Sequence, residues 1–264
     1  MYPYPARLFN STDNYAGYRG GTTLRGWEPS MTKPKAKKSK RQRGPRTAAD
    51  EAPLTTEQII EAGVRLTAAR GLAGWSTRDL AKEVGCWPTA IAHRVGPRHE
   101  VDRVIVDAVM CSVDLPSPEL SWRPWYQQLL TSLHDTLSAH PGVARWLGMA
   151  ATTVPAAVLM IDTGVSKLAE AGLGDEAPAA HIMLLNTAVH LIASEDERDV
   201  DPKLQDAILA SLGMLSEDSQ HPGAAMFADT LAHAFDLDRL YNYAVERALD
   251  GVAARIATRQ PMKP

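Results

Sequence analysis

The spacing of hydrophobic residues predicts helices along nearly all of the chain after residue 55. In residues 55–71, "TTEQIIEAGVRLTAARG", Ile59, Ala62 and Leu66 recur at intervals of three and four, as on one face of a helix. A Thr and a Gln with capping-box spacing precede this stripe, and a Gly follows it. These residues therefore predict a complete amphipathic helix with defined ends.

The next segment has the dimensions of a helix–turn–helix. Residues 76–85, "STRDLAKEVG", predict a short helix that starts at Ser76 and ends at Gly85. A second short helix follows over 87–95, and Gly96-Pro97 breaks the chain before a longer helix over about 97–112. Leu80, Ala81, Val84 and Ile91 are expected to form the contact between the two short helices.

The remainder of the chain shows amphipathic helices separated by Pro and Gly, without a β-strand period or a Gly-rich phosphate loop. The expected spans are 122–140, 142–151, 155–172, 178–195, 203–215, 222–233 and 237–258. The predicted fold class is all-α. We expect an N-terminal three-helix domain with a helix–turn–helix over 51–112, and a larger helical domain over 113–264.

Charge sets residues 1–50 apart from the rest of the chain. They carry eleven Lys and Arg against three acidic residues, a net charge of +8, whereas the other residues carry seventeen against twenty-eight, a net charge of −11. The composition of 1–50 predicts a disordered extension with a basic arm at 33–46. Two interpretations are open for the arm: a solubilising tail, or a segment that lies along DNA phosphates or enters a minor groove.

Two stretches carry a family resemblance. "IIEAGVRLTAARGLAGWSTRDLAKEVG" and "GCWPTAIAHRVGPRHEV", within residues 54–110, resemble the DNA-binding domain of the TetR family of bacterial transcriptional repressors. "WRPWYQQLLTSLHDTLSAHPGVARWLG" and "FDLDRLYNYAVERALDGVAARI" resemble the C-terminal domain of the branch that includes the tetracycline repressor. The resemblance implies a homodimeric repressor that binds a palindromic double-stranded DNA operator and responds to an unidentified small molecule.

The second short helix is expected to enter the major groove. Thr89, Ala90 and His93 would then point at base edges, and Trp87, Arg94 and Arg98 would lie nearer the DNA backbone. Each of these residues has a structural alternative, as a packing or solvated side chain. The candidate DNA-binding residues are Lys37, Lys38, Lys40, Arg41, Arg43, Arg46, Thr77, Trp87, Thr89, Ala90, His93, Arg94 and Arg98.

Two departures from the family pattern bear on DNA binding. Where the family has Leu-Tyr-x-His at the end of the recognition helix, this chain has Ile91-Ala92-His93-Arg94, so the phosphate contact of the tyrosine is lost. Arg94 is a long, permanently charged donor that could compensate. Thr67 occupies a position that is usually Phe, which removes apolar volume; Trp75 and Trp87 could return some of it, or Trp87 could lie at the DNA surface.

The C-terminal half is expected to hold the effector among its middle helices. The candidates are His134, Trp146, Met149, Met160, His181, Asn186 and His190. Asn186 and His190, four residues apart in the apolar "HIMLLNTAVHLIA", are the preferred pair, because buried polar groups need partners. Met and Trp at helical spacing also fit an ordinary core. No ligand set with metal spacing is present, and no cofactor is expected.

Dimerisation is expected through the helices near 178–195 and 237–258. Their apolar stripes would form a four-helix bundle between two subunits. The stripes are Ile182, Leu185, Val189 and Ile192, and Leu240, Ala244, Ala248, Val252 and Ile256. The alternative is that both stripes belong to the core of one subunit.

Other functions have less support in the sequence. A small-molecule-binding protein with a decayed DNA-binding head is the main alternative, because Ala92 and Thr67 depart from the family. An enzyme is not expected, since no nucleophile motif or carboxylate cluster is present. Apolar runs are too short to span a membrane. Cys86 and Cys111 are expected to be reduced thiols in a cytoplasmic protein.

Overall fold

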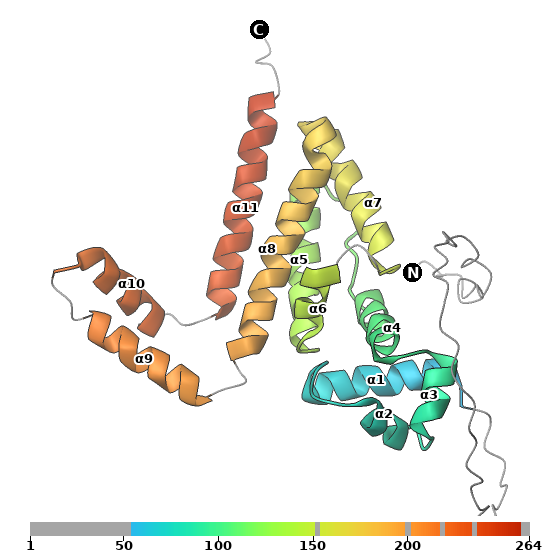
Figure 1. The fold of residues 1–264 in the computed structure, drawn as a ribbon. Helices are drawn as coiled ribbons and strands as arrows, with labels where there is room; N and C mark the ends of the chain where they lie inside the picture. Colours follow the sequence, from blue (N-terminus) through green and yellow to red (C-terminus); the bar gives the residue numbers. More distant parts are fainter. Residues whose placement is uncertain (1–53, 151–153, 199–201, 217–219, 234–236, 260–264) are drawn as a thin grey trace, which may run out of the picture. The chain divides into compact units, whose positions relative to one another are not determined.

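The computed structural model describes residues 54–150, 154–198, 202–216, 220–233 and 237–259. The described chain is all-helical, as predicted (Figure 1). The helices are α1 (Thr56–Arg70), α2 (Thr77–Glu83), α3 (Pro88–Arg94), α4 (Arg98–Cys111), α5 (Trp122–Ser138), α6 (Val143–Ala150), α7 (Ala157–Leu168), α8 (Ala177–Arg198), α9 (Pro202–Ser216), α10 (Pro222–His233) and α11 (Leu237–Arg259). The basic arm lies outside the described residues, so its structural role stays a prediction.

The N-terminal unit consists of α1 to α4, and α1 and α2 begin with the capping boxes that the sequence predicts. Thr55 and Gln58 form a capping box at α1, and Ser76 and Asp79 form a second one at α2. Gly85, with φ +68°, provides the turn between α2 and α3. The caps satisfy backbone donors that would otherwise be unpaired at the helix ends.

Trp75, rather than Trp87, fills the volume that Thr67 leaves in the small N-terminal core. Trp75 is 4% exposed and Thr67 is fully buried. The indole Nε1 of Trp75 donates to Oγ1 of Thr67 at 3.2 Å, and that hydroxyl donates to the carbonyl of Gly63 at 2.8 Å. A hydroxyl therefore suits this position better than a phenyl ring would, because it satisfies the buried indole N–H.

The C-terminal unit is built around α5 and α8. Helix α8 packs against α5, α6, α7 and α11, and α9 packs against α10. The α5 core stripe consists of Trp125, Tyr126, Leu129, Leu130, Leu133 and Leu137. Arg123 of α5 binds Glu246 and Asp250 of α11 at 2.8 and 2.7 Å, which fixes the lateral position of α11 on α5.

The stretch Ala157–Asp196 is long and apolar enough in composition to cross a membrane. The backbone divides it, however, because Gly172 is non-helical at φ 118° and Gly174 has φ 55°. The two helical parts also bury Met160, Leu184 and Ile192 against the other helices of the protein. The core therefore accounts for part of its apolar character, since 33% of its most apolar window is buried and Ile182 and Met183 are exposed.

Candidate functional site: a DNA-binding surface and its link to an effector domain

Helix α3 presents an exposed face next to a tightly packed helix–turn–helix core. Leu80, Ala81 and Ile91 are at most 1% exposed, and they hold α2 against α3. On the outer side, Trp87 is 74% exposed at the start of α3, and Thr89, His93 and Arg94 are exposed along it. Thr77 and Ala90 are only partly exposed. This arrangement leaves the N-terminal turns of α3 free to contact base edges in a major groove.

Sequence reasoning missed two basic side chains on this surface. Arg78 and Lys82 of α2 are exposed and four residues apart, so they lie on one face of that helix. The signal was present, because the capping box at Ser76 fixes the register of α2. Together with Arg94, they give the helix–turn–helix three exposed basic side chains that can donate hydrogen bonds to phosphates.

Arg98 does not belong to this exposed surface, although it was among the candidates for contacting the DNA backbone. Its Nε donates to Asp102 at 2.7 Å, and its two terminal nitrogens donate to the carbonyls of Trp75 and Leu72 at 2.6 and 2.7 Å. The guanidinium carbon also lies 3.7 Å from the centre of the Trp75 ring. Arg98 therefore ties the start of α4 to the loop between α1 and α2.

The same loop is tied to the C-terminal unit. The backbone N–H of Leu72 donates to the carbonyl of Pro141, in the α5–α6 connection, at 2.8 Å. The next residue, Gly142, donates its N–H to a carboxylate oxygen of Asp196, near the end of α8, at 2.8 Å. A chain of hydrogen bonds therefore runs from α8 through the start of α6 to the loop that Arg98 holds.

Helix α4 makes a second connection between the two units. Asp107 accepts the backbone N–H of Ala156, directly before α7, at 2.8 Å. Helix α4 also contacts α5, α6 and α7. A displacement of α6, α7 or α8 would therefore reach the helix–turn–helix of the N-terminal unit both through α4 and through the Leu72–Pro141 contact.

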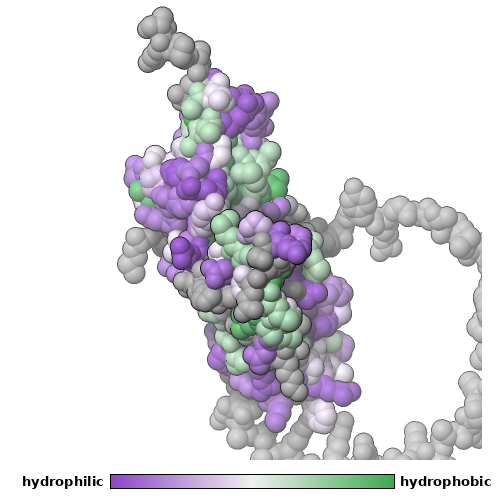
Figure 2. Space-filling view, turned by 90° about the vertical axis from the view of Figure 1, so that its left-hand side faces the viewer, coloured by the Kyte–Doolittle hydropathy of each residue, from purple (hydrophilic) through white to green (hydrophobic). Residues whose placement is uncertain are grey.

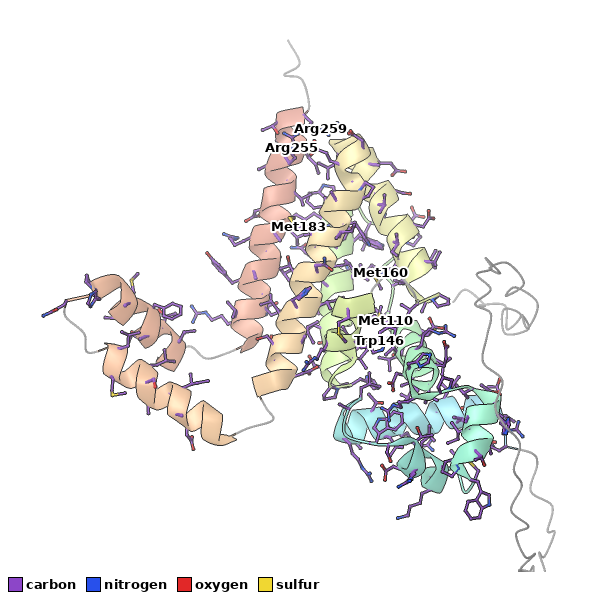
Figure 3. All side chains as sticks on the ribbon, viewed as in Figure 1. Met110, Trp146, Met160, Met183, Arg255 and Arg259 are labelled. Atoms are coloured by element: carbon purple, nitrogen blue, oxygen red, sulfur yellow. The ribbon has the colours of Figure 1, made fainter. Side chains whose placement is uncertain are left out.

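Apolar side chains of α4, α6 and α7 meet in the C-terminal unit. Met110 of α4 and Met160 of α7 are 6% and 1% exposed, and Trp146 of α6 is partly buried. Figure 3 shows the three labelled side chains in the region between these helices. Trp146 and Met160 were predicted as effector-binding residues, whereas Met110 was not, because it was assigned to no stripe of its helix.

His181 is the buried histidine of α8, whereas the preferred pair of Asn186 and His190 lies on its exposed face. The expectation that Asn186 and His190 are buried was wrong, since the core stripe of α8 runs through His181, Leu184, Ala188 and Ile192 instead. The His190 ring bonds only the Asn186 backbone carbonyl among the interactions that the structure describes. His190 and Met149, which is 76% exposed, line a surface groove of about 300 Å³ between α6 and α8.

His134 contacts side chains of two other helices. Its Nε2 lies 3.1 Å from a carboxylate oxygen of Glu195 on α8. Its ring centre lies 4.3 Å from that of Tyr241 on α11, whose hydroxyl donates to the carbonyl of Leu130 at 2.7 Å. His134 therefore joins α5, α8 and α11, a different place from the Met110, Trp146 and Met160 group.

Comparison with known proteins gives a consistent result. No family model matches the chain. The HTH-type transcriptional repressor DrrR1 of Streptomyces coeruleorubidus is 24% identical over 220 residues, covering 78% of this chain and 80% of DrrR1. Apo ActR of Streptomyces coelicolor has a TM-score of 0.67 at 24% identity, covering 78% of this chain and 99% of ActR. BioQ, of Mycobacterium smegmatis, solved with its double-stranded DNA operator, has a TM-score of 0.56 at 17% identity, covering 76% and 99%.

These similarities extend over both units. ActR is described as a TetR family protein and has also been solved in complex with actinorhodin. The resemblance that the helix–turn–helix and C-terminal motifs indicate is thus confirmed by structure and by distant sequence similarity. The chain has the TetR fold, with an N-terminal helix–turn–helix followed by a helical C-terminal domain.

Proposed function

We propose that this protein is a ligand-responsive transcriptional repressor, which binds a palindromic operator as a homodimer and is released by a small molecule. The observation that carries the proposal is the exposed face of α3, which a capped and fully packed helix–turn–helix presents. The similar proteins support it: DrrR1 is a repressor, BioQ was solved on an operator, and ActR was solved with actinorhodin.

The alternative, a small-molecule-binding protein with a decayed DNA-binding head, has one favourable observation. Ala92 is exposed on α3 and offers no hydrogen-bond donor where the family has a tyrosine. Against it, Thr67 does not weaken the head, because Trp75 fills the space and bonds its hydroxyl. The exposed Arg78, Lys82 and Arg94 also retain the positive charge that phosphate binding requires.

The test measures binding of the protein to labelled DNA from upstream of its own gene. Fluorescence anisotropy over a salt series is the readout. Replacing Arg94 by alanine should weaken binding and lower the salt slope by about 0.9 for each lost phosphate contact, hence by roughly 2 for the two heads of a dimer. Arg103→Ala is the matched control, because it removes an arginine of α4 that is paired with Glu100.

A version of the protein that starts at Ala48 would test the arm in the same assay. A shallower salt slope for this version would assign phosphate contacts to residues 33–46. The same assay should include DNA fragments selected from the whole genome. If random DNA competes equally well against the upstream DNA and against these fragments, the proposal is contradicted and the decayed head is favoured. Equal salt slopes for native protein and Arg94→Ala would contradict the role of Arg94.

The proposed dimer interface is the exposed side of α8 and α11. The prediction from the sequence needs revision in its residues, because Val189, Ile192, Val252 and Ile256 are buried within the described subunit. Ile182 and Leu240 of the predicted stripes are exposed, and the exposed Met183 and Tyr243 were not predicted; the four are 44–65% exposed. Figure 2 shows the left-hand side of Figure 1, where green apolar patches lie between purple polar ones.

A groove of about 480 Å³ between α8 and α11 suits close approach of a second copy. Its lining consists largely of small residues, which are Ala179, Ala180, Ala248 and Gly251, and Met183 adds apolar surface. Figure 3 labels Met183 and, toward one end of these helices, Arg255 and Arg259. Arg255 and Arg259 both bind Glu176, and they hold the pKa of that carboxyl at about 2, so this end of the groove keeps a fixed ion-pair cluster.

Replacing Gly251 by arginine should abolish the dimer while leaving the subunit folded. A Cβ atom at Gly251 meets no atom of the described chain within 4 Å, so the new side chain would project into the groove that the partner fills. Gly213→Arg, in α9, is the matched control, because that position is equally open. Sedimentation should show a monomer for Gly251→Arg alone. A native-like dimer for this variant would place the interface elsewhere.

A further inference from the structure

The core of the C-terminal unit contains a cluster of three polar aromatic side chains that the packing alone does not explain. Trp125 and Tyr126 of α5 and His181 of α8 are 1%, 0% and 4% exposed. The ring centres of Trp125 and Tyr126 lie 5.0 Å apart, and those of Tyr126 and His181 lie 5.9 Å apart. The three side chains therefore form one continuous group between α5 and α8.

Helix α7 leaves room for this cluster. A Cβ atom at Gly164 would lie 2.7 Å from both the Tyr126 hydroxyl and Nδ1 of His181. Met160, one turn earlier on the same buried stripe of α7, belongs to the Met110, Trp146 and Met160 group. The polar cluster and the apolar group are thus neighbours along α7.

The hydrogen bond between Tyr126 and His181 defines which nitrogen of His181 carries a proton. Oη of Tyr126 lies 2.6 Å from Nδ1 of His181. Burial raises the pKa of Tyr126 and lowers that of His181 to about 4, so at neutral pH the phenol is protonated and the imidazole is neutral. Because Nδ1 is the acceptor available to the buried hydroxyl, Tyr126 donates to it, and the imidazole proton lies on Nε2.

Two N–H donors of the cluster consequently lack an acceptor. Nε1 of Trp125 is buried and has no hydrogen-bond partner among the residues that the structure describes. Nε2–H of His181 also forms no described hydrogen bond, because the ring bonds through Nδ1, but this nitrogen is not fully buried and keeps some accessible surface. Native proteins satisfy more than about 90% of their buried polar groups, so the unpaired buried indole N–H of Trp125 calls for a specific partner.

We propose that these two donors form the polar end of the effector site, and that the effector is an uncharged ring compound that carries a carbonyl oxygen. This inference rests on the proposed function and specifies its ligand. The exposed alternative at Asn186 and His190 offers no comparable unpaired buried group. A carbonyl oxygen accepts hydrogen bonds and has no proton to donate, which matches free N–H donors, and Met160, one turn from Gly164 on α7, suits an apolar ring.

The chemistry of the cluster disfavours charged ligands. Its free groups are donors, so it offers nothing to a protonated amine. An anion would have to lose its hydration among apolar side chains without a cationic partner in the cluster, because His181 stays neutral above about pH 4. The site therefore selects a neutral acceptor.

The experiment compares binding of 1-tetralone and tetralin, two probes that share a ring skeleton and differ by the carbonyl oxygen. Calorimetric titration of the full-length native protein should give at least about tenfold tighter binding of the ketone, the value of one to two buried hydrogen bonds. Trp125→Phe should reduce this preference by about fivefold or more and leave the affinity for tetralin within twofold. Trp122→Phe is the matched control, because it removes an indole N–H from a partly buried position of α5.

His181 provides an independent pair of variants. His181→Gln retains an acceptor for Tyr126 together with a free N–H, so it should keep most of the ketone preference, whereas His181→Leu should lose it. Equal affinities of the native protein for the two probes, or binding of neither, would overturn the proposal without any variant. The operator assay on the same preparations is separate: retained DNA binding with no ketone preference rejects the ligand class alone, and loss of DNA binding rejects the proposed function.

Discussion

Replacement of Arg98 by alanine is expected to destabilise the DNA-binding unit by about 2–4 kcal/mol and to raise the operator Kd at least tenfold. Arg98 closes three hydrogen bonds at once, to Asp102 and to the carbonyls of Leu72 and Trp75. Its removal leaves the Asp102 carboxylate without its cation. Burial raises the pKa of Asp102, and Arg98 opposes that rise, so the carboxylate depends on this partner. It also removes the cation that stacks on Trp75.

The effect on DNA binding follows from the position of these contacts rather than from a lost phosphate contact. The Leu72 loop is the point at which Pro141 of the C-terminal unit reaches the DNA-binding unit. Without Arg98 the Leu72 loop loses its attachment to α4. The Leu72–Pro141 contact and the contacts of α4 with the C-terminal unit then no longer fix the position of the recognition helix jointly. The salt slope should stay near that of the native protein, whereas a phosphate-binding arginine would lower it.

Two further variants separate these explanations. Arg98→Lys retains the charge but not the fork, and it should recover less than half of the lost stability. The double variant Arg98→Ala with Asp102→Ala should be more stable than Arg98→Ala alone, because no unpaired carboxylate remains. Thermal unfolding measures all three. Native stability for Arg98→Ala combined with a salt slope lowered by about 2 would show that Arg98 contacts DNA instead.

Acidification from pH 7 to pH 4.5 is expected to cost the protein about 2–3 kcal/mol of unfolding free energy through His181 alone. The pKa of His181 is lowered to about 4 by burial, whereas an unfolded histidine titrates near 6.5. Between these values the unfolded chain binds a proton that the native chain does not bind. The stability therefore rises with pH across this window, is complete above about pH 6.5, and is lost as the pH falls toward 4.

His181→Gln should remove this dependence, because glutamine does not titrate. The variant is expected to be less stable than the native protein at pH 7 and to show a flatter profile between pH 6.5 and 5, where carboxylates of ordinary pKa contribute little. His190→Gln, on the exposed face of α8, is the matched control and should keep the native profile. Denaturant unfolding at each pH gives the comparison, and parallel profiles for native protein and His181→Gln would contradict the buried neutral state.

The histidines of α8 also show where sequence patterns reach their limit. Asn186 and His190 are four residues apart in an apolar helix, and the pattern favoured them as a buried pair. The structure buries His181 instead, because α5, α6, α7 and α11 pack around α8 and leave an exposed face that includes Asn186 and His190 together with the apolar Ile182. A helix enclosed on several sides is apolar almost all round, so its hydrophobic pattern cannot identify the exposed face.

The sequence by itself determined the helices, their caps and the helix–turn–helix, since these depend on local spacing and on side chains three or four residues apart. It also determined the resemblance to the TetR family. Only the tertiary structure decided that Arg98 faces inward, that Trp75 fills the space at Thr67, and that Trp125 keeps a buried, unpaired donor. Those outcomes depend on contacts between residues far apart in the chain, which no local pattern encodes.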